Sequence, residues 1–162
     1  MIQEQLDKRI TTSVRVANLP EDIIKAIKRR EKIHQLDNIL SNPIYGIKTD
    51  STKIRLTYLN KLMKRENKTH TVYSFITHEW LVLIVVEGKS IDVVLFKMGT
   101  FDVQKCTSRP ISSFVFADNG IRIMGFRYCE DEHRSDYFLG LGEEHDAKIF
   151  SQKLLELTNR KN

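Results

Sequence analysis

The sequence predicts an α+β fold in which basic N-terminal helices precede a seven-stranded antiparallel β-barrel or sandwich, capped by a C-terminal α-helix. Three observations carry this prediction. Apolar residues recur at helical spacing in the first 69 residues, the period changes to two at residue 70, and helical spacing returns after residue 142. We therefore expect two parts, a basic helical region over residues 1–69 and a β-barrel with its helix over residues 70–162.

The first helix is expected to begin after Asn18, which can cap it, and to end at Asn42-Pro43. Pro20 suits a first-turn position. The turn Arg29-Arg30-Glu31 interrupts the apolar stripe and leaves a bend or partial docking open. Residues 1–17 alternate loosely and fit either a strand or a tail. The apolar stripe consists of Ile23, Ile24, Ile27, Leu36, Ile39 and Leu40.

A second helix is predicted from Ser51 to Glu66, because its apolar residues share one helical face. Basic residues lie elsewhere on its surface, so this helix extends the positive character of the first. The apolar face consists of Ile54, Tyr58, Leu59, Leu62 and Met63.

Seven strands are predicted from alternation and turn signals, and the strongest turn signal is Asp118-Asn119-Gly120. Seven short antiparallel strands in succession need a closed or orthogonally packed sheet to limit open edges. The terminal helix has acidic residues at its N-terminal end and presents Ala147, Phe150, Leu154 and Leu157 to the core, so it can cover one end. The predicted strands are 70–76, 80–86, 91–97, 101–106, 111–117, 121–128 and 136–141.

Three segments carry a resemblance to a known fold: 73–77 leading into 80–84, Arg109-Pro110-Ile111-Ser112-Ser113-Phe114 before the fifth strand, and the closing helix. Together with the order of seven strands and one helix, they resemble the pleckstrin-homology (PH) superfold. Residues 70–160 are similar in particular to the bacterial PH-like families, such as the YokE-like one. PH domains that bind phosphoinositides resemble one another in a basic first hairpin loop. That loop is Thr77-His78-Glu79 here, so the resemblance does not imply inositol phosphate binding.

Positive charge is concentrated in the N-terminal part. Residues 1–70 carry a net charge of +7 and residues 71–162 carry −2, within a total of +5. Such cations could bind the phosphates of nucleic acid, or anionic lipid headgroups, by electrostatic attraction alone. Alternatively, they form a solvated helix face whose charge is balanced by nearby acidic residues. The candidate binding residues are Lys25, Lys28, Arg29, Arg30, Lys32, Lys61, Lys64 and Arg65.

Catalytic and metal-binding patterns are weak. Cys129 and His133 lie four positions apart in an acidic loop and could join a metal site with Cys106, His78 or Asp136. No paired Cys or His motif and no phosphate-cradling glycine motif accompanies them. We therefore expect a protein that is not an enzyme and that has no cofactor and no metal.

The predicted function is a non-catalytic protein-binding or scaffolding module whose partner is another protein. The alternative is electrostatic binding of nucleic acid or anionic membrane through residues 1–69. A cytoplasmic location is expected, because the N-terminus has no signal-peptide pattern and the longest apolar run, Trp80 to Val86, is far shorter than the about 20 residues of a membrane span. Two cysteines do not indicate a disulfide framework. The oligomeric state and the pathway stay open.

Overall fold

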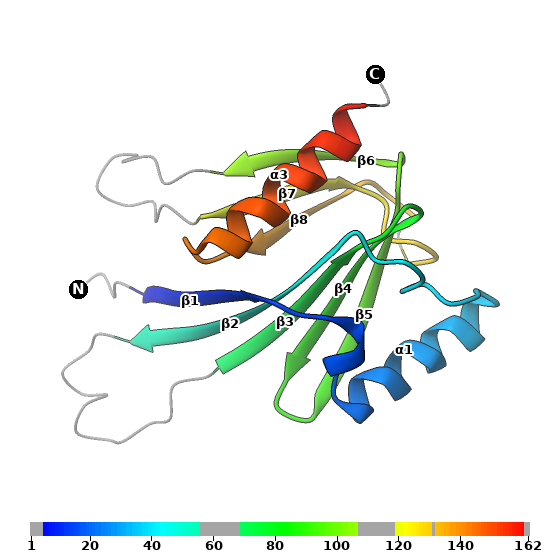
Figure 1. Cartoon of the computed structure of the whole chain (residues 1–162), viewed down its shortest axis with the longest axis horizontal. Helices are drawn as coiled ribbons and strands as arrows, with labels where there is room; N and C mark the ends of the chain where they lie inside the picture. Colours follow the sequence, from blue (N-terminus) through cyan, green and yellow to red (C-terminus); the bar gives the residue numbers. More distant parts are fainter. Residues whose placement is uncertain (1–4, 56–68, 107–118, 131, 161–162) are drawn as a thin grey trace.

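The computed structural model describes residues 5–55, 69–106, 119–130 and 132–160. Within these residues the chain forms eight strands in two antiparallel sheets, a short 3-10 helix and two α-helices (Figure 1). The helices are η1 (Val16–Asn18), α1 (Glu21–His34) and α3 (His145–Asn159).

The larger sheet has five strands in the order β1-β2-β3-β4-β5, so each strand pairs with its neighbour along the chain. The hairpin between β4 and β5 closes through Gly88 and Lys89, and Gly88 has the positive φ of 58° that such a two-residue turn requires. The strands are β1 (Gln5–Ser13), β2 (Tyr45–Arg55), β3 (Thr69–Ile76), β4 (Trp80–Glu87) and β5 (Ser90–Lys97). The smaller sheet has three strands in the order β6-β7-β8, which are β6 (Phe101–Cys106), β7 (Gly120–Gly125) and β8 (Ser135–Gly140).

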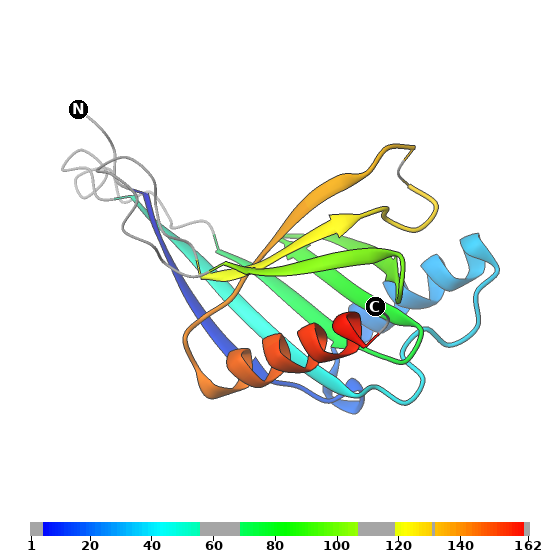
Figure 2. The ribbon, with the colours of Figure 1, turned by 90° about the horizontal axis from the view of Figure 1, so that it is seen from above.

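Both faces of the five-stranded sheet are covered (Figures 1 and 2). One face packs against α3 and the three-stranded sheet, in a core that includes Phe96, Ile123 and Phe150. The other face packs against α1 and the segment after it, in a core that includes Ile23 and Trp80. This two-sided burial explains why residues 80–84 of β4 form one continuous apolar run instead of alternating.

Carboxylates of the α3 N-terminal region bind the outer edge of β1. The backbone N–H of Thr11 donates to Glu144 at 3.0 Å, and the N–H of Ser13 donates to Asp146 at 2.9 Å. The N–H of Gly142 donates to the Thr11 hydroxyl at 2.9 Å. Two carboxylates therefore accept hydrogen bonds from two backbone N–H groups that this edge strand would otherwise expose.

The predicted fold class is wrong in two respects. Among the described residues the strands form two open sheets and not a closed barrel, because no strand ladder joins β5 to β6 or β1 to β8. The described residues of the N-terminal part, 5–55, form one α-helix and two strands in place of several helices. Residues 51–55 of the predicted second helix belong to β2, and 56–66 lie outside the described residues. The two expected parts, 1–69 and 70–162, contribute neighbouring strands to one sheet, because β2 pairs with β3.

The first helix is shorter than expected. It ends at His34, where Gln35 takes a left-handed conformation with a φ of 52°, and not at Asn42-Pro43. Ile39, in the following segment, is still 1% exposed, and its backbone N–H donates to the Glu31 carboxylate at 2.8 Å. The buried residues of the predicted stripe therefore come partly from α1 and partly from the loop that follows it.

The predicted strands are otherwise largely found. Those at 70–76, 80–86, 91–97 and 101–106 are confirmed as β3 to β6, and the one at 136–141 is confirmed as β8. The sixth predicted strand, 121–128, is shortened to β7, and the fifth, 111–117, lies outside the described residues. The N-terminal segment that fitted a strand or a tail contains β1.

Candidate functional site

Helix α1 is fixed on the sheet by apolar packing and by one arginine. Ile23 and Ile27 are buried beneath it. Arg30 reaches from the helix to Asp92 of β5 at 3.2 Å and to Glu130 after β7 at 2.6 Å. A side chain predicted to bind a ligand therefore anchors the helix to two other segments.

The exposed surface of α1 carries four cations, Lys25, Lys28, Arg29 and Lys32, which we call the basic face. At 100° per residue these positions occupy an arc of about 100° on the helix. Lys25 pairs with Glu21 at 2.7 Å, and both side chains are exposed. The other three form no salt bridge with any residue that the structure describes. Three of the four cations of the basic face thus have no ion-pair partner among the described residues of the chain.

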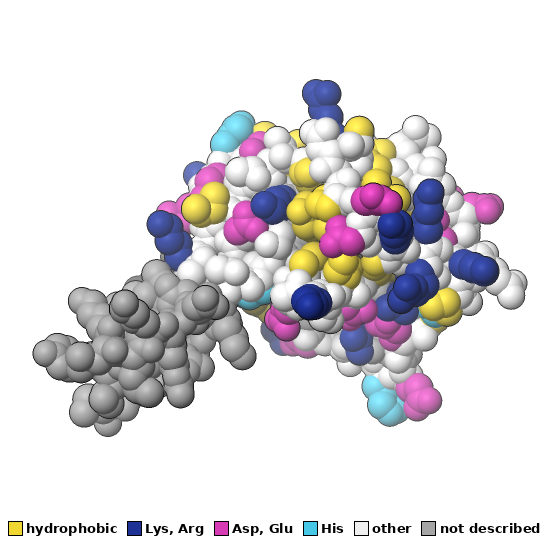
Figure 3. Space-filling model, turned by 90° about the horizontal axis from the view of Figure 1, so that it is seen from below, with side chains coloured by type: hydrophobic (Ala, Val, Ile, Leu, Met, Phe, Trp, Pro, Cys, Tyr) yellow, Lys and Arg dark blue, Asp and Glu magenta, His cyan; other side chains and the backbone are white. Residues whose placement is uncertain are grey.

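A groove of about 550 Å³ runs beside this face, between α1 and the start of β5. Ala26, Ile33, Ile91 and Val93 supply apolar surface, and Ile33 is 64% exposed. Figure 3 views the molecule from below, the side on which α1 lies, and shows apolar surface bordered by both basic and acidic side chains. The charged lining residues are Asp22, Lys25, Arg29, Arg30, Lys89 and Asp92.

The predicted binding residues therefore separate into three groups. Lys25 and Arg29 line the groove from the basic face, while Lys28 and Lys32 continue that face away from it. Arg30 lines the groove but is held by its two ion pairs. The remaining predicted residues, Lys61, Lys64 and Arg65, lie outside the described residues. Lys89, a single charge in the hairpin turn between β4 and β5, also lines the groove and was not among the predicted residues.

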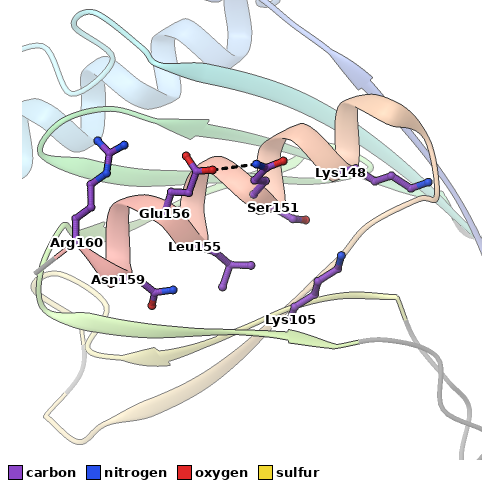
Figure 4. Close-up of a pocket in the computed structure, with 8 residues that line it drawn as sticks. Lys105, Lys148, Ser151, Leu155, Glu156, Asn159 and Arg160 are labelled. Atoms are coloured by element: carbon purple, nitrogen blue, oxygen red, sulfur yellow. Dashed lines mark hydrogen bonds between the residues drawn. The ribbon is translucent and has the colours of Figure 1, made fainter. Parts of the chain in front are cut away.

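A second groove, of about 590 Å³, lies between α3 and β6. Lys105 reaches from β6 toward the helix, and Leu155 reaches from the helix toward β6 (Figure 4). Glu156 accepts a hydrogen bond from Gln152 at 2.9 Å. The other lining residues are Lys148, Ser151, Asn159 and Arg160. Nothing in the sequence pattern marked this groove, because it joins two elements about forty positions apart.

The cysteine and histidine pattern does not assemble into a metal cluster. Within the described ranges no group of three or more His, Cys, Asp or Glu side chains could hold a metal ion. Cys106 and Cys129 are free thiols, and Cys129 is exposed. Coulombic interaction with Cys129, then burial, raises the pKa of the neighbouring Tyr128 phenol.

The ion pairs of the smaller sheet are exposed. Arg122 of β7 pairs with Asp136 of β8, and Arg134 pairs with Asp102. The hydrogen bonds from Arg122 lower the pKa of the Asp136 carboxyl. The Arg122–Asp136 pair joins adjacent strands and stabilises the sheet surface, and the Arg134–Asp102 pair connects the residue before β8 with β6.

Comparison of the chain with protein-family models, with curated proteins and with solved structures finds no match. In the part of the chain that the structure describes, no helix has the length and apolar character needed to cross a membrane. The two grooves and the basic face are the candidate functional sites of the described residues.

Proposed function

We propose that the protein is a non-catalytic binding module that holds an acidic surface of another protein against the basic face of α1 and the adjoining groove. The observation that carries the proposal is the basic face itself. Three of its four cations, Lys28, Arg29 and Lys32, have no salt bridge to a described residue. The helix that bears them is held by its own core and by Arg30, so a partner meets a preformed surface at low ordering cost.

The groove favours a protein over a polyphosphate. Asp22 and Asp92 lie among its lysines and arginines, and they would repel the phosphates of a nucleic acid or a lipid headgroup layer. Its apolar lining, with the exposed Ile33, gives no advantage to a phosphodiester chain. A protein segment with carboxylates, apolar side chains and an occasional cation is complementary to all three kinds of lining residue.

The test compares one defined acidic peptide with one defined nucleic acid. The peptide alternates Glu and Leu, the nucleic acid is a duplex of equal net charge, and binding is measured by fluorescence anisotropy at low and moderate salt. The variant K28E/R29E reverses two charges of the basic face. The matched control K8E/K97E makes the same charge change on exposed lysines of β1 and β5.

We expect the peptide to bind the wild-type protein and the control, with affinity falling by about tenfold or more in K28E/R29E, since charge-assisted contacts are lost and replaced by repulsion. Equal loss in both variants would mean that only net charge matters and would contradict the proposal. Tighter binding of the duplex than of the peptide would instead favour nucleic acid, and binding of anionic vesicles in a parallel assay would favour a membrane surface.

Two further predictions accompany this proposal. The cytoplasm is the proposed location, supported by the free thiols of Cys106 and Cys129, which reducing compartments maintain. The resemblance to the bacterial PH-like family stays a prediction, and the proposed binding surface does not depend on it.

A further inference from the structure

The groove between α3 and β6 has a lining of a different character from the groove beside α1. Its walls are mainly hydrocarbon, supplied by Leu155 and by the aliphatic stems of long side chains. Three cations line it, Lys105, Lys148 and Arg160, against the single acid Glu156. The volume of about 590 Å³ lies within the range of small-molecule sites.

The cations come from both walls. Lys105 lies on β6 and Lys148 lies in the first turn of α3, and both side chains are exposed. Neither forms a salt bridge with a residue that the structure describes. The one acid, Glu156, already accepts a hydrogen bond from Gln152 and is thus partly engaged (Figure 4). An anion entering the groove therefore meets positive charge from two directions and little opposing negative charge.

We propose that this groove binds a small amphipathic carboxylate, with its anionic head between Lys105 and Lys148 and its apolar body against Leu155. A compact hydrated anion such as phosphate would leave the hydrocarbon walls uncovered, and a neutral apolar molecule would gain no attraction from the two exposed ammonium groups. Only a ligand with both parts satisfies the whole lining. This site is separate from the proposed protein-binding surface, since no residue lines both grooves.

Four probes separate the parts of this inference. Decanoate carries both the head and the apolar body, decanol carries the body alone, acetate carries the head alone, and inorganic phosphate is the compact anion. Each is titrated into the full-length protein by calorimetry, well below the concentration at which decanoate forms micelles. We expect decanoate to bind with one-to-one saturation and the other three to bind much more weakly.

Charge reversal then locates the site. K105E reverses a charge on the β6 wall of the groove, and K148E reverses a charge on the α3 wall. If one variant fails to fold, the other still tests the groove. The matched control K97E reverses an exposed lysine on β5 that does not line the groove. We expect decanoate affinity to fall about tenfold or more in K105E and in K148E, because a charge-assisted contact becomes repulsive, and to be unchanged in K97E. Thermal melts confirm that the variants fold.

Several results would overturn the inference. They are the failure of decanoate to saturate, an unchanged decanoate affinity in both groove variants, and acetate or phosphate binding as tightly as decanoate. None of them bears on the peptide assay of the basic face, so the two proposals fail separately.

Discussion

Replacing Asp146 with alanine is expected to destabilise the protein by about 2.5 kcal/mol, because this carboxylate joins three segments. It accepts a hydrogen bond from the Tyr45 hydroxyl of β2 at 2.9 Å and another from the backbone N–H of Ser13 of β1 at 2.9 Å. It also lies in the first turn of α3. The partly buried Tyr45 bond to a charged acceptor accounts for about 1.5 kcal/mol, and the exposed Ser13 bond for about 0.5 kcal/mol. Favourable placement at the helix N-terminus adds about 0.5 kcal/mol.

Urea unfolding measures this loss against two controls. D146N keeps a carbonyl acceptor but removes the charge, so we expect about half the loss. E143A removes an exposed acid near the same helix end and is expected to change stability by less than about 0.5 kcal/mol. An unfolding curve for D146A that overlays the E143A curve would refute the view that Asp146 ties β1 and β2 to α3.

The same contact has a pH signature at Tyr45. Burial raises the pKa of this phenol, and the hydrogen bond to Asp146 raises it further. The native state therefore holds the neutral phenol more strongly than the unfolded chain does. This contribution is complete below the unfolded pKa of about 10 and is lost as the pH rises through the higher native pKa. In D146A only burial remains, so the fall in stability above pH 10 should be shallower than in the wild type, and an equally steep fall would refute this assignment.

Three further substitutions test local packing, each by thermal melting. G46A is expected to cost at least about 2 kcal/mol, because the new Cβ would overlap the buried ring of Phe75 and lie 2.7 Å from the Val14 carbonyl oxygen; an unchanged melting temperature would contradict this. S74A is expected to be neutral or to stabilise by about 1 kcal/mol, since this buried hydroxyl has no hydrogen-bond partner among the described residues, and a clear loss would reveal a partner. C129G is expected to gain up to about 1 kcal/mol, because the residue has a φ of 58° that glycine adopts without strain, and a loss would point to a structural use of the thiol.

Sequence reasoning succeeded where apolar residues alone define an element. The hairpin of β4 and β5 is delimited by its turn and by two dense apolar runs, and α3 is marked by an amphipathic stripe from Ala147 to Leu157. Strand β2 was missed for a physical reason. Its buried residues along one face are Ile47, Thr49 and Ser51, so the alternation that marks a strand is carried by hydroxyl side chains. The Thr49 hydroxyl is accommodated by the Thr11 hydroxyl of β1 at 2.9 Å, a contact with no local signature.

The candidate sites were predictable to a similar extent. Helical spacing placed Lys28 and Arg29 on an exposed helix face, and the structure agrees. It could not show that Arg30 turns to Asp92 and Glu130, because those partners lie 62 and 100 positions away along the chain. Contacts at such separations depend on the packing of whole elements, which no local pattern encodes. The α3–β6 groove escaped prediction for the same reason.

Both outer strands of the larger sheet make bonds to segments outside the sheet. At one edge, Glu144 and Asp146 accept the outward N–H groups of β1. At the other, the N–H of Tyr128 donates to the Leu95 carbonyl of β5 at 2.7 Å, and Arg30 crosses to Asp92 beside it. At each edge, hydrogen bonds from a loop or a side chain occupy part of the free backbone in place of a further strand, which limits unwanted strand pairing. The two binding proposals accordingly rest on side-chain chemistry and not on the addition of a strand to these edges.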